Sequence, residues 1–492
     1  MYERQFVIAD KNYIIDYNWS EISIGDSLCL KYHPLLNCTV TNEESRQIIL
    51  LGYILDPSNP ELSNSEITKN ILVSCSDITD ISIATEKLNG RYLIIYTDKT
   101  TFILGDPYGL RSVYYTFDGN NHLFCASQPG HISKALGLKY NQTLQSEFFE
   151  SDYYKKEREA WIPSGITLYD SIKHLVPNHY LDCAIQKQIR FWPRHRRVSN
   201  KPEDVVSKCA SLIQNSILAA SKRSELALPL TAGYDSRIIM AATKVISDKI
   251  FYYTLKYGNL IEDSPDITIP KKILGDLGLK HNVFDCYEEM DKVFKDSWVN
   301  NIELAHTYYG DIAFGMKSVI PPDKIALKGV SEVARGFFYK IKKNSGYDLA
   351  KLMSMESCPF IVSVFEDWLN KSEKVIEESD YKMLDVFYWE HRLGSWRAMS
   401  ALEFDVIHDI LDPFNCRYLI ELFLSVDEKY RIGKYPLLRM IIKELWPEML
   451  NYPINPLFGK DKFINSIRDV SIKLGFFELG QKYFGVIKKY LT

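Results

Sequence analysis

The stretch from Leu226 to Ala242 constrains the fold more than any other part of the chain. An apolar run, LALPL at Leu226–Leu230, enters the small-residue turn Thr231–Gly233 and leaves it as the helical pattern YDSRIIMAA. A strand, a tight turn and a helix in this order aim backbone N–H groups and the positive end of the helix at one point, which is how a phosphate group is held. The spacing fits neither G-x-x-x-x-G-K-[ST] nor G-x-G-x-x-G, so kinase-like and dehydrogenase chemistry are disfavoured. Similar turns occur in folds that bind no ligand, so the loop alone leaves a purely structural role open.

Individual side chains of this loop have the chemistry that a phosphate site needs. Gly233 allows a tight turn and close approach, and Thr231 and Ser236 supply hydroxyl donors. Asp235 can hold a magnesium ion that bridges phosphates. We therefore predict phosphate binding between this strand and this helix.

The segments around the loop alternate between strand and helix. Helical patterns are found at Pro202–Ala220, Ser236–Val245 and Ile267–Leu277, and strand patterns at Leu226–Leu230, Ile250–Lys256 and Lys280–Asp285. This alternation is typical of a parallel sheet covered by helices on both faces. After about Met290 the pattern is mainly helical, with helices expected at Tyr381–Leu402, Arg417–Leu424 and Leu437–Trp446.

The first part of the chain has a different pattern. Short β-rich runs are separated by turn residues, as at Ile48–Leu55, Gly90–Tyr96, Thr101–Leu104, Ser112–Phe117 and Leu123–Ala126. A polar stretch, PRHRRVSNKP, follows Trp192 and is unsuited to a sheet or a core. With 492 residues available, we predict two large domains, residues 1–195 and 196–492.

Composition excludes several classes of protein. The 59 Lys and Arg residues nearly balance the 63 Asp and Glu residues, giving a net charge of −4, so nothing supports nucleic-acid binding. The apolar runs are too short for a membrane span, and Met1–Asp10 lacks the apolar core of a signal peptide, so a cytoplasmic protein is expected. The nine cysteines form no C-x-x-C pair, which argues against a disulfide framework or a zinc site.

Five segments resemble, in the same order, motifs of the asparagine synthetase superfamily. T-A-G-Y-D-S-R at 231–237 is similar to the family's S-G-G-x-D-S pyrophosphatase loop, and the run that begins at Ser264 is similar to S-x-D … L-G-x-x-H. The segment Leu327–Phe337 resembles S-G-E-G-x-D-E-x-F-G-G-Y, and Leu402–Asn415 and Lys434–Arg439 resemble E-x-R-x-P-F-L-D and K-x-x-L-R. The resemblance implies an α/β fold of the ATP pyrophosphatase (adenine nucleotide α-hydrolase-like) type with a helical C-terminal part, for about residues 200 to 460.

The first 195 residues resemble the glutaminase domain of the same family. Leu88–Tyr92, Asp106–Tyr115 and Phe124–Ser127 are similar to its L-x-G-x-F, D-x-x-G-x-x-P-L-Y-Y and F-A-S-E segments. The resemblance implies a class II glutaminase-like (Ntn-type) α+β sandwich. Such a glutaminase uses an N-terminal cysteine, exposed after removal of Met1, but position 2 is Tyr2, and Leu51–Tyr53 replaces the N-G-E motif that contributes to the oxyanion hole. We therefore expect a degenerate domain, as in the similar β-lactam synthetases and lasso-peptide cyclases.

The resemblance implies an ATP-dependent, AMP-forming carbon–nitrogen ligase of the asparagine synthase-like type, with ATP and Mg²⁺ as cofactors. It would adenylate a carboxylate, release pyrophosphate and transfer the acyl group to an amine without hydrolysing glutamine. The carboxylate would belong to a sugar uronate, a peptide or an amino acid derivative. Two alternatives remain: a non-catalytic ATP-binding scaffold and an ammonia-dependent asparagine synthetase. The sequence also leaves open a homo-oligomer or a complex with a partner biosynthetic enzyme.

The same resemblance assigns roles to single residues. Asp235 and Glu332 would bind magnesium, and Lys434 would stabilise the acyl-adenylate, unless Tyr435 takes that register. Glu390 or Glu403 would deprotonate the amine, although each could instead be a buried structural carboxylate. The residues expected to contact the nucleotide are Leu230, Thr231, Gly233, Tyr234, Asp235, Ser236, Arg237, Tyr257 and Gly329. Arg237 and Arg335 would hold a phosphate or a substrate carboxylate, or else form ordinary ion pairs.

Overall fold

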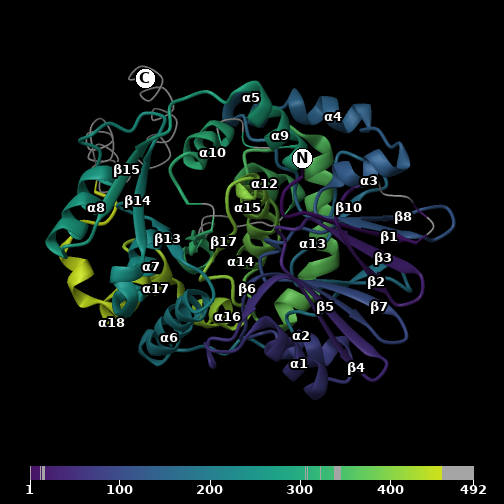
Figure 1. Ribbon diagram of the computed structural model, residues 1–492, viewed down its shortest axis with the longest axis horizontal. Coiled ribbons are helices and arrows are strands. Elements are labelled where there is room, and N and C mark those ends of the chain that lie inside the picture. The colour runs from purple at the N-terminus through teal and green to yellow at the C-terminus, as the bar shows by residue number, and fades with distance from the viewer. Residues whose placement is uncertain are drawn as a thin grey trace.

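A computed structural model of the chain describes residues 2–11, 13, 17–304, 306, 309–321, 323–336 and 345–456. In Figure 1 the strands of the first part of the chain lie on the right and most of the parallel sheet lies on the left, with helices between them and around them. Within the described residues the strands form two antiparallel sheets and one parallel sheet. No helix of this part of the chain is long and apolar enough to cross a membrane.

The two antiparallel sheets form a sandwich. The first has the strand order β10-β8-β9-β1-β3-β2 and the second β12-β11-β7-β6-β5-β4. The strands of the first sheet are β1 (Phe6–Asp10), β2 (Ser20–Ile24), β3 (Leu28–Tyr32), β8 (Tyr114–Phe117), β9 (Leu123–Ala126) and β10 (Lys173–His174). Those of the second are β4 (Cys38–Glu43), β5 (Arg46–Leu55), β6 (Asn89–Thr97), β7 (Thr101–Gly105), β11 (His179–Asp182) and β12 (Lys187–Arg190).

The continuous apolar run of β5 is explained by burial on both of its faces. Ile49 and Leu51 pack between the two sheets against Ile8 of β1. Ile48 and Leu50 face the other way and pack against the helices α1 (Asn64–Ser74) and α2 (Ile78–Ala84). Helix α3 (Pro129–Leu136) covers the outer face of the first sheet, and α4 (Gln142–Phe149) and α5 (Asp152–Glu157) follow it in the chain.

The second part of the chain forms a parallel five-stranded sheet in the order β15-β14-β13-β16-β17. Its strands are β13 (Leu226–Pro229), β14 (Phe251–Lys256), β15 (His281–Asp285), β16 (Ile325–Leu327) and β17 (Ile410–Leu411). Leu226 and Leu228 pack on one face, against α6 (Pro202–Ser221), α7 (Tyr234–Ala242), α8 (Pro265–Asp276) and α18 (Pro436–Leu445). Ala227 faces α9 (Lys292–Ile302) and α10 (Tyr309–Lys317) on the other. The predicted α/β class, an α+β sandwich followed by a parallel sheet, is confirmed.

The helical C-terminal part is also present. Helix α13 (Pro359–Glu378) is followed by α14 (Met383–Phe387), the π-helical stretch η2 (Tyr388–Arg397) and α15 (Ala398–Phe404), so the helix predicted at 381–402 contains a π-helical insertion. The remaining helices are α11 (Glu332–Arg335), α12 (Gly346–Leu352), α16 (Arg417–Ser425) and α17 (Glu428–Arg431), with the short 3₁₀ helices η1 (Lys244–Lys249) and η3 (Pro447–Asn451).

The sandwich and the parallel-sheet part share buried polar contacts. Arg91 of β6 donates to Asp405 at 2.8 Å and to Asp409 at 2.8 Å, and Arg111 lies 3.1 Å from Asp409. Burial alone would raise the pKa of Asp409, but the two guanidinium groups outweigh it and hold that pKa well below its usual range. The Asn89 side chain also donates to the Pro413 carbonyl at 2.9 Å. The domain boundary at 195/196 stays a prediction; β12 ends at Arg190 and α6 begins at Pro202.

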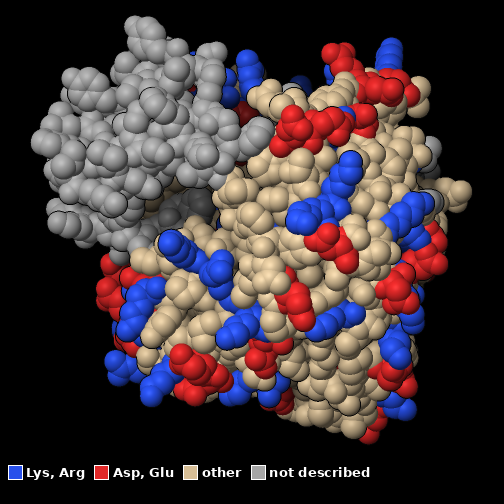
Figure 2. Space-filling model, turned by 90° about the vertical axis from the view of Figure 1, so that its left-hand side faces the viewer, with Lys and Arg blue, Asp and Glu red and all other residues tan. Residues whose placement is uncertain are grey.

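Charge on the surface is mixed. On the face drawn in Figure 2, blue Lys and Arg side chains and red Asp and Glu side chains are interspersed over the described residues. This distribution agrees with a net charge of −4. The described part of this face therefore presents no extended field of one sign of the kind that captures nucleic acid.

Candidate functional site

The carboxyl ends of β13, β14 and β16 border a cavity of about 300 Å³. Strands of a parallel sheet end at one edge, and ligands of open α/β sheets bind at that edge. The structure brings six of the predicted residues into its wall: Leu230, Thr231, Asp235, Ser236, Tyr257 and Gly329. The side chains of Tyr253, Leu255, Ile312, Met316 and Phe404 supply apolar surface.

Hydrogen bonds to its own side chains hold the loop in shape. The hydroxyl groups of Thr231 and Ser236 lie 3.0 Å apart, and the backbone N–H of Thr231 donates to Ser236 Oγ at 3.2 Å. The N–H of Gly233 donates to Thr231 Oγ1 at 3.2 Å, and the N–H of Ala232 donates to Asp266 Oδ1 at 2.9 Å. These N–H groups and hydroxyls lie at the N-terminus of α7, where a phosphate would be favoured.

Gly233 has a φ of −76°, which any residue adopts, so the turn does not need glycine for its backbone conformation. Glycine matters here for space. A Cβ at this position would lie 3.3 Å from Thr231 Oγ1 and 3.6 Å from Asn455 Oδ1. Of the two roles expected for Gly233, the structure shows that the turn does not need glycine for its backbone conformation, and close approach of a phosphate stays a prediction.

A guanidinium group lies beside both carboxylates that were expected to bind magnesium. Arg335 Nη2 is 3.3 Å from Asp235 Oδ2 and 3.1 Å from Glu332 Oε1. The other oxygen of Asp235 accepts hydrogen bonds from the N–H and the hydroxyl of Ser331. In the described residues no group of three or more His, Cys, Asp or Glu side chains could hold a metal ion. The carboxylates as arranged do not fit a protein-held Mg²⁺, because Arg335 takes the place of the cation.

Asp412 holds the turn that carries Gly329. It is fully buried, and its carboxylate accepts from the N–H groups of Val330 at 3.1 Å and Phe414 at 3.0 Å. Burial raises the pKa of Asp412 to about 7, against the opposing effect of Arg397. A Cβ on Gly329 would lie 2.8 Å from the Phe414 ring, so only glycine lets this turn pack against the ring.

Lys328 was missed by the sequence predictions. It follows β16 directly and lines the cavity, with its Nζ 3.8 Å from the centre of the Phe404 ring. Burial and, to a smaller extent, the nearby Arg397 lower the pKa of Lys328 to about 7. A lysine immediately after an apolar strand, inside a motif already singled out, was the available signal.

Three predicted residues lie beside the loop but outside the cavity wall. Arg237 is fully buried and donates to the carbonyls of Met449 at 2.8 Å and Pro453 at 3.1 Å, so it is a structural anchor. Tyr234 donates through its hydroxyl to the carbonyl of Lys434 at 3.1 Å. Lys434 is exposed, and its neighbour Tyr435 adopts a left-handed φ of 50°.

The two candidate bases occupy different environments. Glu390 is fully buried and accepts from Arg190 at 2.6 and 2.8 Å, from Asn178 at 3.0 Å and from Trp368 at 2.8 Å. Burial is outweighed by Arg190, and the pKa of Glu390 falls to about 2. The structure does not bring Glu390 to the loop, and its acceptor positions are taken.

Glu403 is also fully buried, and it pairs with a residue that the sequence predictions missed. His306 lies with its Nδ1 2.8 Å from Glu403 Oε1, and its backbone N–H donates to the same oxygen at 2.8 Å. Nε2 of His306 has no hydrogen-bond partner among the described residues. The next residue of this helix, Phe404, lines the cavity, so Glu403 lies closer to it than Glu390 does.

Aromatic side chains surround position 2. The ring of Tyr2 lies 4.3 Å from that of His131 and 5.5 Å from that of Tyr17. The hydroxyl of Tyr17 lies 2.8 Å from His131 Nδ1. At the position of the expected oxyanion-hole motif, Tyr53 is buried and donates to the carbonyl of Ile410 in β17. Both positions are thus used for packing.

Comparison with known proteins gives only distant similarity. No protein-family profile matches the sequence, and no curated protein sequence matches it. Among solved structures, the chain is similar to glutamine phosphoribosylpyrophosphate amidotransferase from B. subtilis, complexed with ADP and GMP. That match has 12% identity and a TM-score of 0.24, and it covers 57% of this chain and 65% of that one. The chain therefore spans slightly less than two thirds of that protein.

Two further solved structures are similar to a comparable extent. The allosteric regulatory enzyme of purine biosynthesis matches at 11% identity and a TM-score of 0.24, over 72% of this chain and 73% of that one. The NH3-dependent NAD synthetase from Campylobacter jejuni, in complex with a nitrate ion, matches at 14% identity and a TM-score of 0.22, over 42% of this chain and 97% of that one. Similarities of this extent assign no function.

Proposed function

We propose that the chain is an ATP-dependent ligase that adenylates a carboxylate, releases pyrophosphate and transfers the acyl group to an amine without hydrolysing glutamine. The observation that carries the proposal is the loop 231–236, which lies at the carboxyl edge of a parallel sheet beside a cavity lined by both polar and apolar side chains. Thr231 and Ser236 at the start of α7 suit a triphosphate, and the apolar wall near Tyr257 suits a base.

Adenylation needs charge stabilisation more than it needs covalent chemistry. When a carboxylate oxygen attacks the α-phosphorus, the departing pyrophosphate accumulates negative charge that the site must stabilise. The donors available are the hydroxyls of Thr231 and Ser236, the N-terminus of α7, and the cations of Lys328 and Arg335. In this mechanism Arg335 leaves its ion pairs with Asp235 and Glu332 and pairs with a phosphate of the nucleotide instead. Lys434 approaches the acyl-adenylate from its exposed turn.

Amide formation then requires a neutral amine, because a protonated amine cannot attack. Glu403, paired with His306, is our candidate to receive the proton, and Glu390 takes no part. The absence of glutamine hydrolysis is proposed because Tyr2 and Tyr53 replace the thiol and the oxyanion-hole motif of the similar glutaminases. Ammonia or a substrate amine would supply the nitrogen.

One observation favours the alternative of a non-catalytic ATP-binding scaffold. Arg335 pairs with both carboxylates that would otherwise be available for a metal ion. A scaffold would bind ATP at the same loop and would release no pyrophosphate.

The deciding measurement is the release of AMP and pyrophosphate by the full chain. The protein is incubated with ATP, magnesium, ammonium and a pool of amino acids, glucuronate, galacturonate and short peptides. We expect wild type to form AMP and pyrophosphate, and Asp235→Ala to reduce both at least a hundredfold, because the loop loses the group that orders Ser331 and Arg335. Asp263→Ala, which removes an exposed carboxylate next to Ser264, is the matched control. Unchanged turnover in Asp235→Ala would contradict the proposal, and ATP binding without AMP would favour the scaffold.

A further inference from the structure

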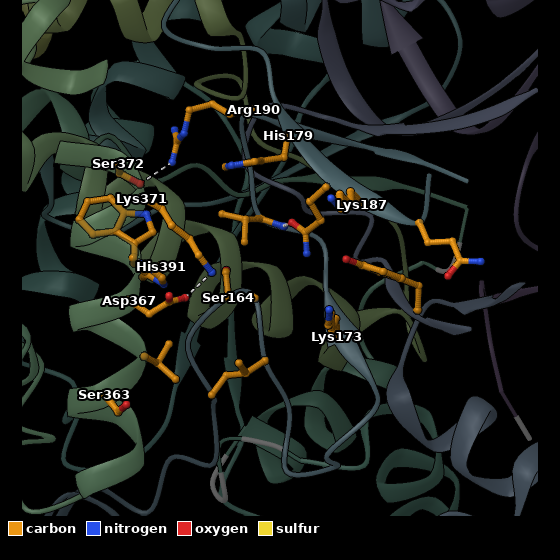
Figure 3. A pocket seen from close by; sticks show the side chains of 18 residues that line it. Ser164, Lys173, His179, Lys187, Arg190, Ser363, Asp367, Lys371, Ser372 and His391 are labelled. Carbon is orange, nitrogen blue, oxygen red and sulfur yellow. Dashed lines mark hydrogen bonds and ion pairs between the residues drawn. The ribbon is translucent and has the colours of Figure 1, made fainter. Parts of the chain in front are cut away.

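A second cavity, larger than the one beside loop 231–236, belongs to no site described above. It has a volume of about 770 Å³ and lies between the strands β10 to β12 of the sandwich and the helices α13 and η2 (Figure 3). Its wall shares no residue with the wall of the nucleotide cavity. Its size is in the range of pockets that hold small organic ligands.

Two buried polar groups of its wall have no partner. His391 of η2 is 1% exposed, and neither of its ring nitrogens has a hydrogen-bond partner among the described residues. Ser164 is 2% exposed, and its hydroxyl is likewise unpartnered. Buried polar side chains are nearly always hydrogen-bonded, so each such exception needs an explanation. Figure 3 shows both side chains at the cavity.

His391 presents a neutral ring. Burial lowers the pKa of His391 to about 3, so at neutral pH one ring nitrogen donates and the other accepts. The aromatic rings of Phe365, Phe387 and Trp368 lie 5.1 to 5.3 Å from it and hold it in place. A donor and an acceptor side by side, with the Ser164 hydroxyl in the same wall, are complementary to hydroxyl groups of a ligand rather than to an anion alone.

The wall also contains cationic side chains. Lys173 and Lys187 line the cavity, and neither forms an ion pair with a carboxylate of the described residues. Lys371 forms an ion pair with Asp367 at 2.5 Å, and Arg190 forms an ion pair with Glu390. The cavity therefore has two uncompensated positive charges.

We propose that this cavity binds a sugar carrying a carboxylate or a phosphate, with Lys173 and Lys187 facing the anionic group and His391 and Ser164 facing hydroxyl groups. Trp368, in the same wall, offers an apolar ring face to the sugar. The inference is independent of the proposed ligase activity, because no residue of the nucleotide loop contributes to it.

Calorimetric titration of the full chain tests the proposal with four probes: glucuronate, glucose 6-phosphate, glucose and inorganic phosphate. We expect at least one of the two anionic sugars to bind with a Kd below about 1 mM, and at least tenfold more tightly than glucose or inorganic phosphate. Tighter binding of glucuronate would identify a carboxylate ligand, and tighter binding of glucose 6-phosphate a phosphorylated one. Absence of binding by both at 10 mM probe, a concentration about ten times that Kd, would overturn the proposal.

Variants locate the binding in this cavity. Lys173→Gln with Lys187→Gln removes the two charges and is expected to weaken the anionic sugar at least tenfold. Lys69→Gln with Lys99→Gln, two exposed lysines elsewhere in the sandwich, is the control and should leave the Kd unchanged. Ser164→Ala should weaken the anionic sugar severalfold without changing the affinity for inorganic phosphate. Binding that survives the first double variant, or inorganic phosphate that binds as tightly as the sugars, would overturn the assignment.

Discussion

Charged side chains near the cavity beside loop 231–236 differ in whether a side chain of opposite charge lies close to them. Arg335 contacts both Asp235 and Glu332, and Lys328 lies over the Phe404 ring rather than beside a carboxylate. A ligand with several negative charges would therefore compete for Arg335 and would find Lys328 without a close anionic partner. The charge state of Lys328 then controls part of the affinity for the ligand.

We predict that ATP binding weakens as the pH rises from 6 to 8.5. The pKa of Lys328 is lowered to about 7, so the side chain is charged at pH 6 and mostly neutral at pH 8.5. The groups that face it are Arg397, Glu403 and His408, and burial lowers the pKa of His408 to about 4, so this histidine stays neutral throughout. Loss of the charge should raise the Kd for ATP about tenfold over this interval. This change corresponds to a pKa of Lys328 that is roughly one unit higher in the ATP complex than in the free protein.

Titration calorimetry at a series of pH values measures this dependence. Lys328→Arg keeps the charge at every pH and should flatten the profile, and Lys328→Met should give the weak binding of high pH at pH 6 as well. Titration of the ATP phosphates and of Asp412, whose pKa is about 7, is common to all three proteins and cancels in the comparison. Parallel profiles for wild type and Lys328→Arg would contradict the prediction.

Single residues were predictable from the sequence where their role is local. Leu230, Thr231, Asp235 and Ser236 were predicted from the motif at 231–237 and the strand before it, and the structure places all four at the cavity. The surroundings of Glu390 could not be predicted, because they are set by Arg190 and Asn178, which precede it by about 200 residues. To predict the pairing of Glu332 with Arg335, one would have had to know that the short helix α11 turns both side chains toward Asp235.

At the scale of elements, α7 also anchors the C-terminal segment of the described chain. Arg237 donates to the carbonyls of Met449, Tyr452 and Pro453 around the end of η3. A few residues later, the N–H of Asn455 donates to the carbonyl of Ala232 in the phosphate loop at 2.9 Å. The segment after α18 is thus held by hydrogen bonds to α7 and to loop 231–236.

Arg237→Met is predicted to destabilise the protein by about 3 kcal/mol, because carbonyls that accepted from a buried charged donor lose it. For a chain of this length the loss corresponds to a melting temperature lower by about 3 °C. Differential scanning calorimetry measures it, with Arg439→Met on the exposed side of α18 as the control, expected within about 0.5 kcal/mol of wild type. Equal melting temperatures for the two variants would refute the anchoring role.

Elements with a strong period were predicted with boundaries close to those observed. Helix α6 and the strands β13 to β15 lie where the apolar pattern placed them. The strands β1 to β3 were not predicted, since they are five residues long and β2 is largely exposed, so their alternation is weak. Strands β16 and β17 were missed because three and two residues give no period to detect.

At the scale of the whole molecule, the sandwich and the parallel-sheet part are joined through buried charge. Arg91 and Arg111 come from the sandwich, and Asp405 and Asp409 come from the segment between α15 and β17. Removing one member of a buried ion-pair network leaves an uncompensated charge in the interior, which typically costs about 3–5 kcal/mol.

We therefore predict that Arg91→Met lowers the temperature of unfolding and that both parts still unfold in one calorimetric transition. Destabilisation by about 3–5 kcal/mol is expected, because Asp405 and Asp409 lose the arginine that hydrogen-bonds to both of them. Arg196→Met, which removes an exposed arginine of the polar linker, is the matched control and should behave as wild type. Two separated transitions already in the wild-type protein, or an unchanged melting temperature in Arg91→Met, would show that the network does not join the parts.

The buried contacts between the sandwich and the parallel-sheet part limit how the chain could evolve. Tyr53 of the sandwich donates to a carbonyl of β17 in the parallel sheet, and Trp389 of η2 donates to the carbonyl of Pro107 at 2.7 Å. A lineage that lost the chemistry of one part could replace that part's reactive side chains one at a time. Deleting the part outright would expose the buried surface of the other and leave its arginines and aspartates without partners. Selection for folding alone would therefore be enough to preserve either part in a lineage that had lost the chemistry of that part.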